Sequence, residues 1–216
     1  MTYDEIKKNK EICECLRKGD ENLGVLGYTD HSAAHCTMVA KRAAYILKKF
    51  GYSEEDIELV KIAGFMHDIG NVINRSHHAE YGALLANELL KETDMTLEDR
   101  VTIVSAIGNH DESTGSPEDV ISAALIIADK TDVRRNRVQN PNKAKFDIHA
   151  CVNYAALSSS LKIDQEKRLI QMNLELDDSI CSLMDYFEIF LERMLMCKRA
   201  AQCLNCRFRL VANTWI

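Results

Sequence analysis

The chain has 216 residues, 46% of them hydrophobic, and a formal net charge of −6 because 33 acidic residues outnumber 27 basic ones. This composition supports a buried core and excludes wholesale disorder, and the negative charge argues against nucleic acid or an anionic membrane as a partner. The N-terminal segment MTYDEIKKNK lacks the apolar stretch of a signal peptide, and the longest nearly apolar run, 120–128, is too short to span a bilayer. We therefore expect a cytoplasmic protein.

Glycines and capping residues divide the first part of the chain into six predicted helices. The first is predicted over residues 3–18 and ends at Gly19. The other five are predicted over about 31–50, 53–69, 77–91, 96–110 and 116–138, four of them with N-caps at Asp30, Ser53, Thr96 and Ser116.

The periodicity changes beyond residue 140. Residues 170–176 alternate between apolar and polar side chains, which is typical of a half-buried strand. The predicted elements here are strands over 151–163, 170–176 and 204–210, a turn over 164–167 and a long amphipathic helix over 179–200. We therefore predict a mainly α protein, with an all-α domain over residues 1–146 and a small ββαβ appendage over 147–216. The helix of the appendage is expected to cover one face of its three-stranded sheet.

Five consecutive predicted helices each carry a histidine or an aspartate on the stripe of residues that faces inward. Any one of these residues, taken alone, is more often an ordinary core or surface residue. A buried imidazole or carboxylate without a partner is costly, however, and one shared metal site satisfies all of them together. A mixed set of nitrogen and oxygen ligands suits Mn, Fe, Zn, Co or Mg. The candidate ligands are His35, His67, Asp68, His78, His110 and Asp129.

The order of these residues resembles the H…HD…D signature of the HD-domain metal-dependent phosphohydrolases. The flanking segments are also similar to those of the family, with HDIG at 67–70, an HxxxGA segment at 78–83, an IxxH segment at 107–110 and ADK at 128–130. The resemblance covers roughly residues 28–138. One departure is Asn71, which stands where many relatives continue the HDIG segment with lysine.

This resemblance implies an all-α bundle that binds one or two divalent metal ions, of Fe, Mn, Co, Ni, Zn or Mg. In family members with two metals, the position that matches Asp68 bridges them, and the positions that match His78 and His110 complete the second site. The positions that match the first metal site are His35, His67, Asp68 and Asp129.

The activity implied by the resemblance is hydrolysis of a phosphate ester or anhydride by a metal-activated water. The expected substrate is a nucleotide or another small phosphorylated metabolite. We expect Asp68 and Asp129 to be catalytic, since either carboxylate can orient or deprotonate the water. Asp132, one turn beyond Asp129, is either a support for the ligands or an ordinary solvated residue. The cations expected to bind the substrate phosphate are Lys130, Arg75, Arg42 and Arg134.

Two other functions remain open at this point. A dinuclear iron oxygenase on the same scaffold uses six ligands of the kind found here. A non-catalytic metal or nucleotide sensor is the second alternative, because the predicted appendage offers a sheet edge or helix through which a homodimer can form.

Overall fold

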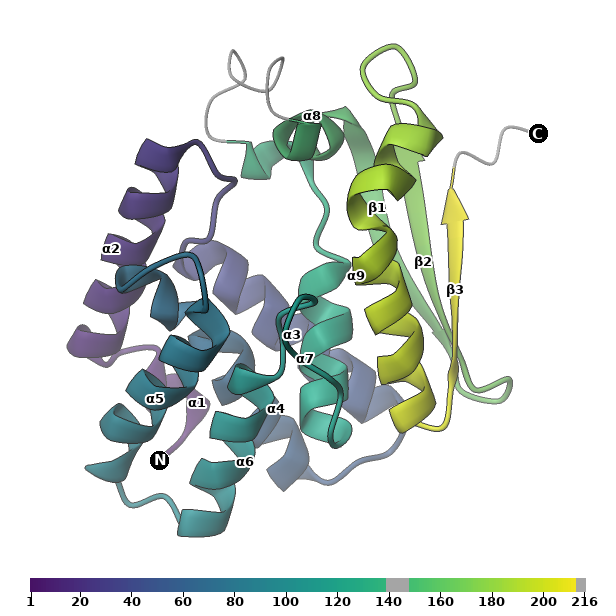
Figure 1. Cartoon of the computed structure of the whole chain (residues 1–216). Coiled ribbons are helices and arrows are strands. Elements are labelled where there is room, and N and C mark those ends of the chain that lie inside the picture. The colour runs from purple at the N-terminus through teal and green to yellow at the C-terminus, as the bar shows by residue number, and fades with distance from the viewer. Residues whose placement is uncertain (139–147, 213–216) are drawn as a thin grey trace.

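The computed structural model describes residues 1–138 and 148–212, and Figure 1 shows a group of helices beside a small sheet formed near the C-terminus. The helical part begins with α1 (Tyr3–Ile6), α2 (Lys10–Leu26), α3 (Ala33–Lys49), α4 (Glu54–Met66), η1 (Ile69–Val72), α5 (His78–Lys91), α6 (Leu97–Gly108), α7 (Val120–Lys130) and η2 (Arg135–Arg137). It is followed by α8 (Ile148–Ala155), β1 (Ala156–Asp164), β2 (Leu169–Leu176), α9 (Leu183–Cys203) and β3 (Arg207–Ala212). The prediction of a mainly α protein with a ββαβ segment is confirmed.

Capping side chains set the beginnings of several helices. Ser53 forms a capping box with Asp56 at the start of α4, and the Thr96 side chain accepts a hydrogen bond from the backbone N–H of Asp99 at the start of α6. Both starts agree with the predictions. The predicted start of α7 at Ser116 is wrong, because the capping box is formed by Asp119 with Ser122. The helix also ends at Lys130, well short of the predicted residue 138.

The N-terminal helix differs from its prediction because Gly19 does not end it. The chain forms the short helix α1 and then α2, which continues through Gly19 and ends at Gly27. A Cβ atom at Gly19 would lie 3.0 Å from the backbone nitrogen of Val72, in η1. Gly19 therefore allows α2 to pack closely on η1, and a glycine that serves packing is indistinguishable from a helix stop in the sequence.

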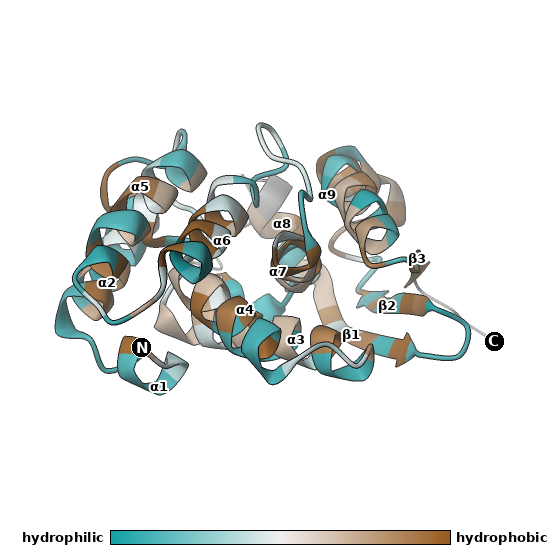
Figure 2. Ribbon diagram, turned by 90° about the horizontal axis from the view of Figure 1, so that it is seen from below, coloured by the Kyte–Doolittle hydropathy of each residue, from teal (hydrophilic) through white to brown (hydrophobic). Residues whose placement is uncertain are grey.

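Helix α7 is the central element of the core. It packs against α3, α4, α6 and α9, and nearly all of its side chains are buried. Figure 2 shows α7 surrounded by other helices, with a ribbon that is apolar over most of its length. An apolar helix that is covered on several sides contributes strongly to stability through burial. Its last turn carries Asp129 and Lys130 into the centre of the molecule.

The sheet has the order β1-β2-β3. Strands β1 and β2 form an antiparallel hairpin whose turn agrees with the prediction, and the carboxylate of Asp164 accepts a 2.9 Å hydrogen bond from the backbone N–H of Lys167. Strand β3 pairs in parallel with β2, so α9 is the helical crossover that such a pair requires. The predicted strand over 151–163 is wrong in its first part, because residues 148–155 form α8 and bury Val152 and Ala155 three residues apart.

Helix α9 joins the sheet to the rest of the molecule, since it packs against both α7 and β3. In Figure 1 it lies between α7 and the strands. The predicted domain boundary at residue 146 lies outside the described residues, so the division into two domains stays a prediction. Among residues 1–138 and 148–212, none of the helices combines the length and apolar character needed to cross a membrane.

Candidate metal centre

The structure brings all six predicted ligand residues together, although they come from separate helices. Asp68 has its two carboxylate oxygens directed to different groups of histidines. Its Oδ2 atom lies 3.1 Å from Nε2 of His67 and 3.6 Å from Nε2 of His35. Its Oδ1 atom lies 3.7 Å from Nε2 of His78. The six residues are His35 in α3, His67 and Asp68 between α4 and η1, His78 at the start of α5, His110 just beyond α6 and Asp129 in α7.

The first ligand group consists of His35, His67 and Asp129. The Oδ1 atom of Asp129 lies 3.4 Å from Nε2 of His35 and 3.7 Å from Nε2 of His67. Both histidines are buried, whereas the Asp129 side chain keeps 14% of its surface exposed. Two imidazole nitrogens and a carboxylate oxygen therefore converge on one point at the edge of a cavity.

The second ligand group consists of Asp68, His78 and His110. The Nε2 atoms of His78 and His110 lie 3.2 Å apart. All three residues are buried. Asp68 therefore contacts both groups of histidines, each through a different carboxylate oxygen.

Each of the four histidines is oriented by its Nδ1 atom, which leaves Nε2 facing the centre. Nδ1 of His35 lies 2.8 Å from Oδ2 of Asp132. The Nδ1 atoms of the other three lie against backbone carbonyl oxygens, those of Gly64 for His67 at 2.9 Å, Arg75 for His78 at 3.2 Å and Ile107 for His110 at 2.6 Å. A hydrogen bond of this kind fixes the tautomer in which Nε2 has a free lone pair, as metal-binding histidines require.

A glycine allows the second group to approach the first. An added Cβ at Gly70, in η1, would lie only 2.0 Å from the backbone oxygen of His78 and 2.5 Å from the backbone nitrogen of Gly82. The start of α5 therefore packs directly on the backbone after Asp68. This contact places His78 beside the Asp68 carboxylate. The side chain of Asn71 supports the same carboxylate, because its Nδ2 donates a 2.8 Å hydrogen bond to Oδ1.

The donor atoms of this centre fit a metal. Nε2 of His35, Nε2 of His67 and Oδ2 of Asp68 are buried and have no hydrogen-bond partner among the described residues. Leaving such atoms unpaired costs free energy that a cation shared between them removes. The nitrogen and oxygen donors suit a divalent transition metal. Cys36 also lies near His67 and Asp68, and burial raises the pKa of its thiol.

The electrostatics of the centre also fit a bound metal ion. Burial opposes a positive charge on His67, but the carboxylates of Asp68 and Asp129 outweigh it and raise the pKa of His67 well above its usual value. Burial and the neighbouring His78 instead lower the pKa of His110 to about 3. The first group thus attracts positive charge, and the second keeps a neutral imidazole.

Two of the predicted substrate-binding cations lie behind His35 and do not line the cavity. Nε and Nη2 of Arg134 donate hydrogen bonds to the two carboxylate oxygens of Asp132, at 2.7 Å and 2.9 Å. Nη2 of Arg42 lies 3.7 Å from Oδ1 of the same carboxylate. Asp132 is buried and holds the imidazole of His35. Arg42 and Arg134 are therefore placed where they fix Asp132, and Asp132 supports a candidate ligand.

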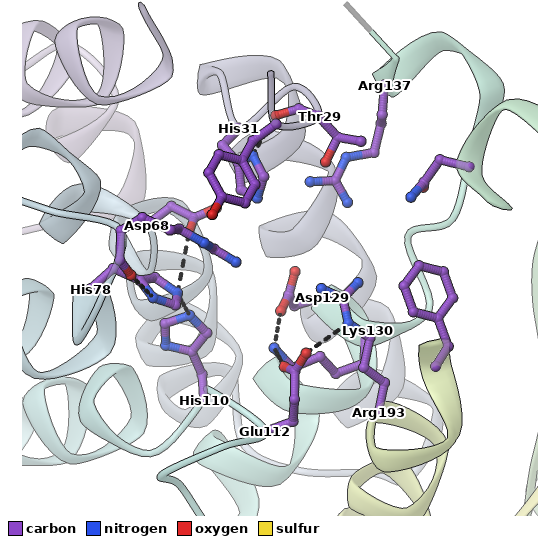
Figure 3. Close-up of a pocket in the computed structure, with 14 residues that line it drawn as sticks. Thr29, His31, Asp68, His78, His110, Glu112, Asp129, Lys130, Arg137 and Arg193 are labelled. Carbon is purple, nitrogen blue, oxygen red and sulfur yellow. Dashed lines mark hydrogen bonds and ion pairs between the residues drawn. The ribbon is translucent and has the colours of Figure 1, made fainter. Parts of the chain in front are cut away.

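The cavity beside the centre has a volume of about 170 Å³, room for several waters or a small anionic group. Two of the predicted cations, Lys130 and Arg75, line it, and Figure 3 shows Lys130 beside Asp129. The other lining residues include Tyr28, Thr29, His31, Asp68, His78, His110, Glu112, Asp129, Arg137, Asn153, Phe190 and Arg193.

Part of the cavity wall comes from the C-terminal segment, which the sequence did not indicate. Asn153 lies in α8, and Phe190 and Arg193 lie in α9. Nε of Arg193 lies 2.8 Å from Oε1 of Glu112, 81 residues away in the sequence. The apolar stripe of α9 is compatible with a core of its own, so no local pattern shows that one of its arginines reaches the cavity.

Comparisons with known proteins identify part of the chain as an HD domain, since residues 33–137 match the model of that family. The chain is 30% identical to an uncharacterized protein of Methanocaldococcus jannaschii, in a match that covers 69% of this chain and 66% of the relative. It is 39% identical to a second uncharacterized protein of that organism over 30% of this chain and 37% of the relative, so the chain spans less than two thirds of either.

Among solved structures, one that matches part of the chain is described as a predicted HD superfamily hydrolase from an uncultured Thermotogales bacterium. The sequences are 22% identical, the TM-score is 0.47, and the match covers 62% of this chain and 75% of the other.

Proposed function

Because residues 33–137 match the model of the HD-domain family, we propose that the chain is a metal-dependent phosphohydrolase of that family. The proposed reaction is cleavage of a phosphate ester or anhydride in a nucleotide or another small phosphorylated metabolite. The observation that supports it is the group of buried, unpaired donor atoms of His35, His67 and Asp68 beside a cavity that Arg75 and Lys130 line.

The proposed metal ligands are the six residues of the centre. His35, His67 and Asp129 would hold one ion, and His78 and His110 a second, with Asp68 shared between them. When bound, a divalent ion supplies a water of lowered pKa and neutralises charge on the phosphate. The proposed ions are Fe, Mn, Co, Ni or Zn, or Mg, since nitrogen and oxygen donors suit all of them to different degrees.

Asp129 and Asp68 are the proposed catalytic residues. Asp129 faces the cavity and remains partly exposed, so its carboxylate is placed to orient the attacking water. Asp68 is buried and is held by Asn71, which keeps its two oxygens directed at the two groups of histidines. Its proposed role is to fix the positions of the ligands relative to each other.

Lys130 and Arg75 are the proposed partners of the substrate phosphate. Burial opposes the charge of Lys130, but Asp129 and Glu112 outweigh it and raise the pKa of the lysine, so the ammonium group is retained. Nη1 of Arg75 lies 4.0 Å from Oδ1 of Asp68, at the other side of the cavity. A phosphate bound between these cations lies beside the metal ligands, where charge that develops during cleavage is stabilised.

Hydrolysis of a panel of nucleotides, cyclic dinucleotides and sugar phosphates, followed by chromatography of the products, tests the proposal. The protein is assayed with added Mn, Co, Fe, Ni, Zn or Mg, beside Asp68→Asn and the control Asp4→Asn, which changes an exposed aspartate in α1. We expect turnover of one class of compound, its loss in Asp68→Asn and its retention in Asp4→Asn. A metal-loaded protein that cleaves none of these compounds contradicts the proposal and favours an iron oxygenase or a sensor. The cytoplasmic location and the homodimer stay predictions.

A further inference from the structure

The carboxylate of Glu112 lies between two cations of the cavity wall (Figure 3). Its Oε2 atom is 2.6 Å from Nζ of Lys130, and its Oε1 atom is 2.8 Å from Nε of Arg193. Lys130 also lies 2.9 Å from Oδ2 of Asp129. A chain of alternating charges thus runs from the candidate metal centre to helix α9.

The two cations and the carboxylate differ in how firmly the backbone holds them. Lys130 is the last residue of α7, and Arg193 lies in the middle of α9 with its guanidinium 4.6 Å from the centre of the Phe190 ring. Glu112 instead lies in a turn between α6 and α7. Side chains of Glu112 and Arg193 are each 23% exposed, whereas that of Lys130 is 4% exposed. The carboxylate can therefore move toward solvent while both cations stay in place.

The other two arginines of the cavity wall have different partners. Arg137 donates to the backbone oxygens of Asp30 and Asp132, which ties two loops together. Arg75 lies over the ring of Tyr28 and beside Asn71. The pair Lys130 and Arg193 is distinguished by a shared side-chain carboxylate, a group with the charge and oxygen geometry of one edge of a phosphate.

We propose that Lys130 and Arg193 form an anion subsite for a phosphate group of the substrate, and that Glu112 is its internal counter-ion, displaced when the phosphate binds. This inference rests on the proposed function, because it assigns a group of the same substrate. It adds that α9, outside the region matched by the family model, takes part in substrate binding.

The displacement of Glu112 by phosphate follows from their charges. A phosphate group brings more negative charge than a carboxylate and offers paired oxygens to the guanidinium of Arg193. Until it binds, Glu112 neutralises two cations that otherwise face each other inside the protein. The same carboxylate competes with phosphate, which weakens binding of the product and favours its release.

Binding of inorganic phosphate to the metal-loaded protein, measured by isothermal titration calorimetry, tests the subsite without turnover. Relative to the wild type, Arg193→Gln is expected to weaken binding at least about tenfold, and Glu112→Gln to tighten it by a similar factor. The matched control is Arg199→Gln, which changes an exposed arginine of the same helix and is expected to bind as the wild type does. Phosphate held by the metal alone is insensitive to all three substitutions, and that result overturns the proposal.

Thermal unfolding distinguishes a variant with altered phosphate binding from one that simply folds poorly. Without its carboxylate, the Glu112→Gln protein is expected to melt at a lower temperature than the wild type. Added phosphate is expected to raise the melting temperature of this variant by more than it raises that of the wild type. An equal shift in both proteins contradicts the displacement of Glu112. If no phosphate compound is cleaved while these binding changes appear, the proposed function fails and the subsite stands. Turnover with unchanged phosphate binding in both variants overturns the subsite and supports the proposed function.

Discussion

His78 and His110 face each other through their Nε2 atoms at 3.2 Å, while the Nδ1 atom of each lies against a backbone carbonyl oxygen. With the proton on Nδ1, both Nε2 atoms carry lone pairs, and two lone pairs at this distance repel. Burial lowers the pKa of both imidazoles, so a proton shared between them is disfavoured. A metal ion held by both nitrogens would remove the repulsion, and the neighbouring Oδ1 atom of Asp68 would be a third donor.

Replacement of one of these histidines is expected to remove one metal ion. We expect the wild type to bind two equivalents of metal and His78→Asn to bind one, as measured by elemental analysis after gel filtration. The control is His77→Asn, at the neighbouring residue, whose side chain is 65% exposed and whose φ of 60° asparagine tolerates. A wild type with a single ion that His78→Asn leaves in place contradicts the shared role of Asp68.

Removal of the metal is expected to destabilise the fold, because the buried donor atoms of His35, His67 and Asp68 lose their partner. At a free-metal concentration a hundredfold above Kd, binding contributes about 2.7 kcal/mol, which corresponds to roughly 5 to 10 °C in Tm for a chain of this size. Differential scanning calorimetry with and without a chelator measures the shift. The Asp68→Asn protein serves as the comparison and should show a smaller shift in Tm on addition of the chelator. Equal melting curves for the wild type with and without the chelator refute the prediction.

Asp132 is expected to act on the metal through His35, because it holds Nδ1 of that imidazole at 2.8 Å. Asp132→Asn should lower metal affinity about 10- to 100-fold, the usual effect of losing a carboxylate that orients a metal-binding histidine. A competition titration with a chromophoric chelator measures this. Arg134→Gln, which removes a side chain that contacts Asp132 without touching His35, should have a smaller effect. Unchanged metal affinity in Asp132→Asn would show that the histidines oriented by backbone carbonyl oxygens are sufficient to hold the metal.

Gly70 is expected to tolerate no side chain, since an added Cβ would meet the backbone of His78 at 2.0 Å and that of Gly82 at 2.5 Å. Backbone atoms cannot move aside as a flexible side chain does, so Gly70→Ala should lower the free energy of unfolding by about 3 kcal/mol or more. The matched control is Gly108→Ala, whose Cβ would meet Ala83 at 3.4 Å. At the end of α6 that change should stabilise by at most about 1 kcal/mol. Urea unfolding of both variants distinguishes crowding from a general effect of adding a methyl group.

The sequence indicated the candidate ligands because their positions follow a local rule. A helix repeats every 3.6 residues, so a histidine in line with apolar residues is directed to the core whatever the other helices do. His35 and Asp129 are such residues, and Nε2 of His35 lies 3.4 Å from Oδ1 of Asp129. The starts of α4 and α6 were predictable for the same reason, since a capping side chain contacts backbone within its own first turn.

The errors of sequence interpretation occurred where distant segments decide the outcome. Gly19 resembles a helix stop, but it lies inside α2 because η1 packs against it. Residues 151–155 are compatible with a strand, yet they form a helix that packs on η2 and α9. In both cases the energy of packing against another part of the chain outweighs a weak local preference.

What the sequence by itself determined is the set of groups available for chemistry: the order of histidines and aspartates, their inward direction and the helices that carry them. Only the tertiary structure decided which cations serve the cavity. Arg42 and Arg134 are near the motifs in sequence but bind Asp132, whereas Arg193 reaches Glu112 across 81 residues. The physical reason is that an arginine side chain is long and flexible, and its partner is set by the packing of α9 against α7, which no periodicity within one helix records.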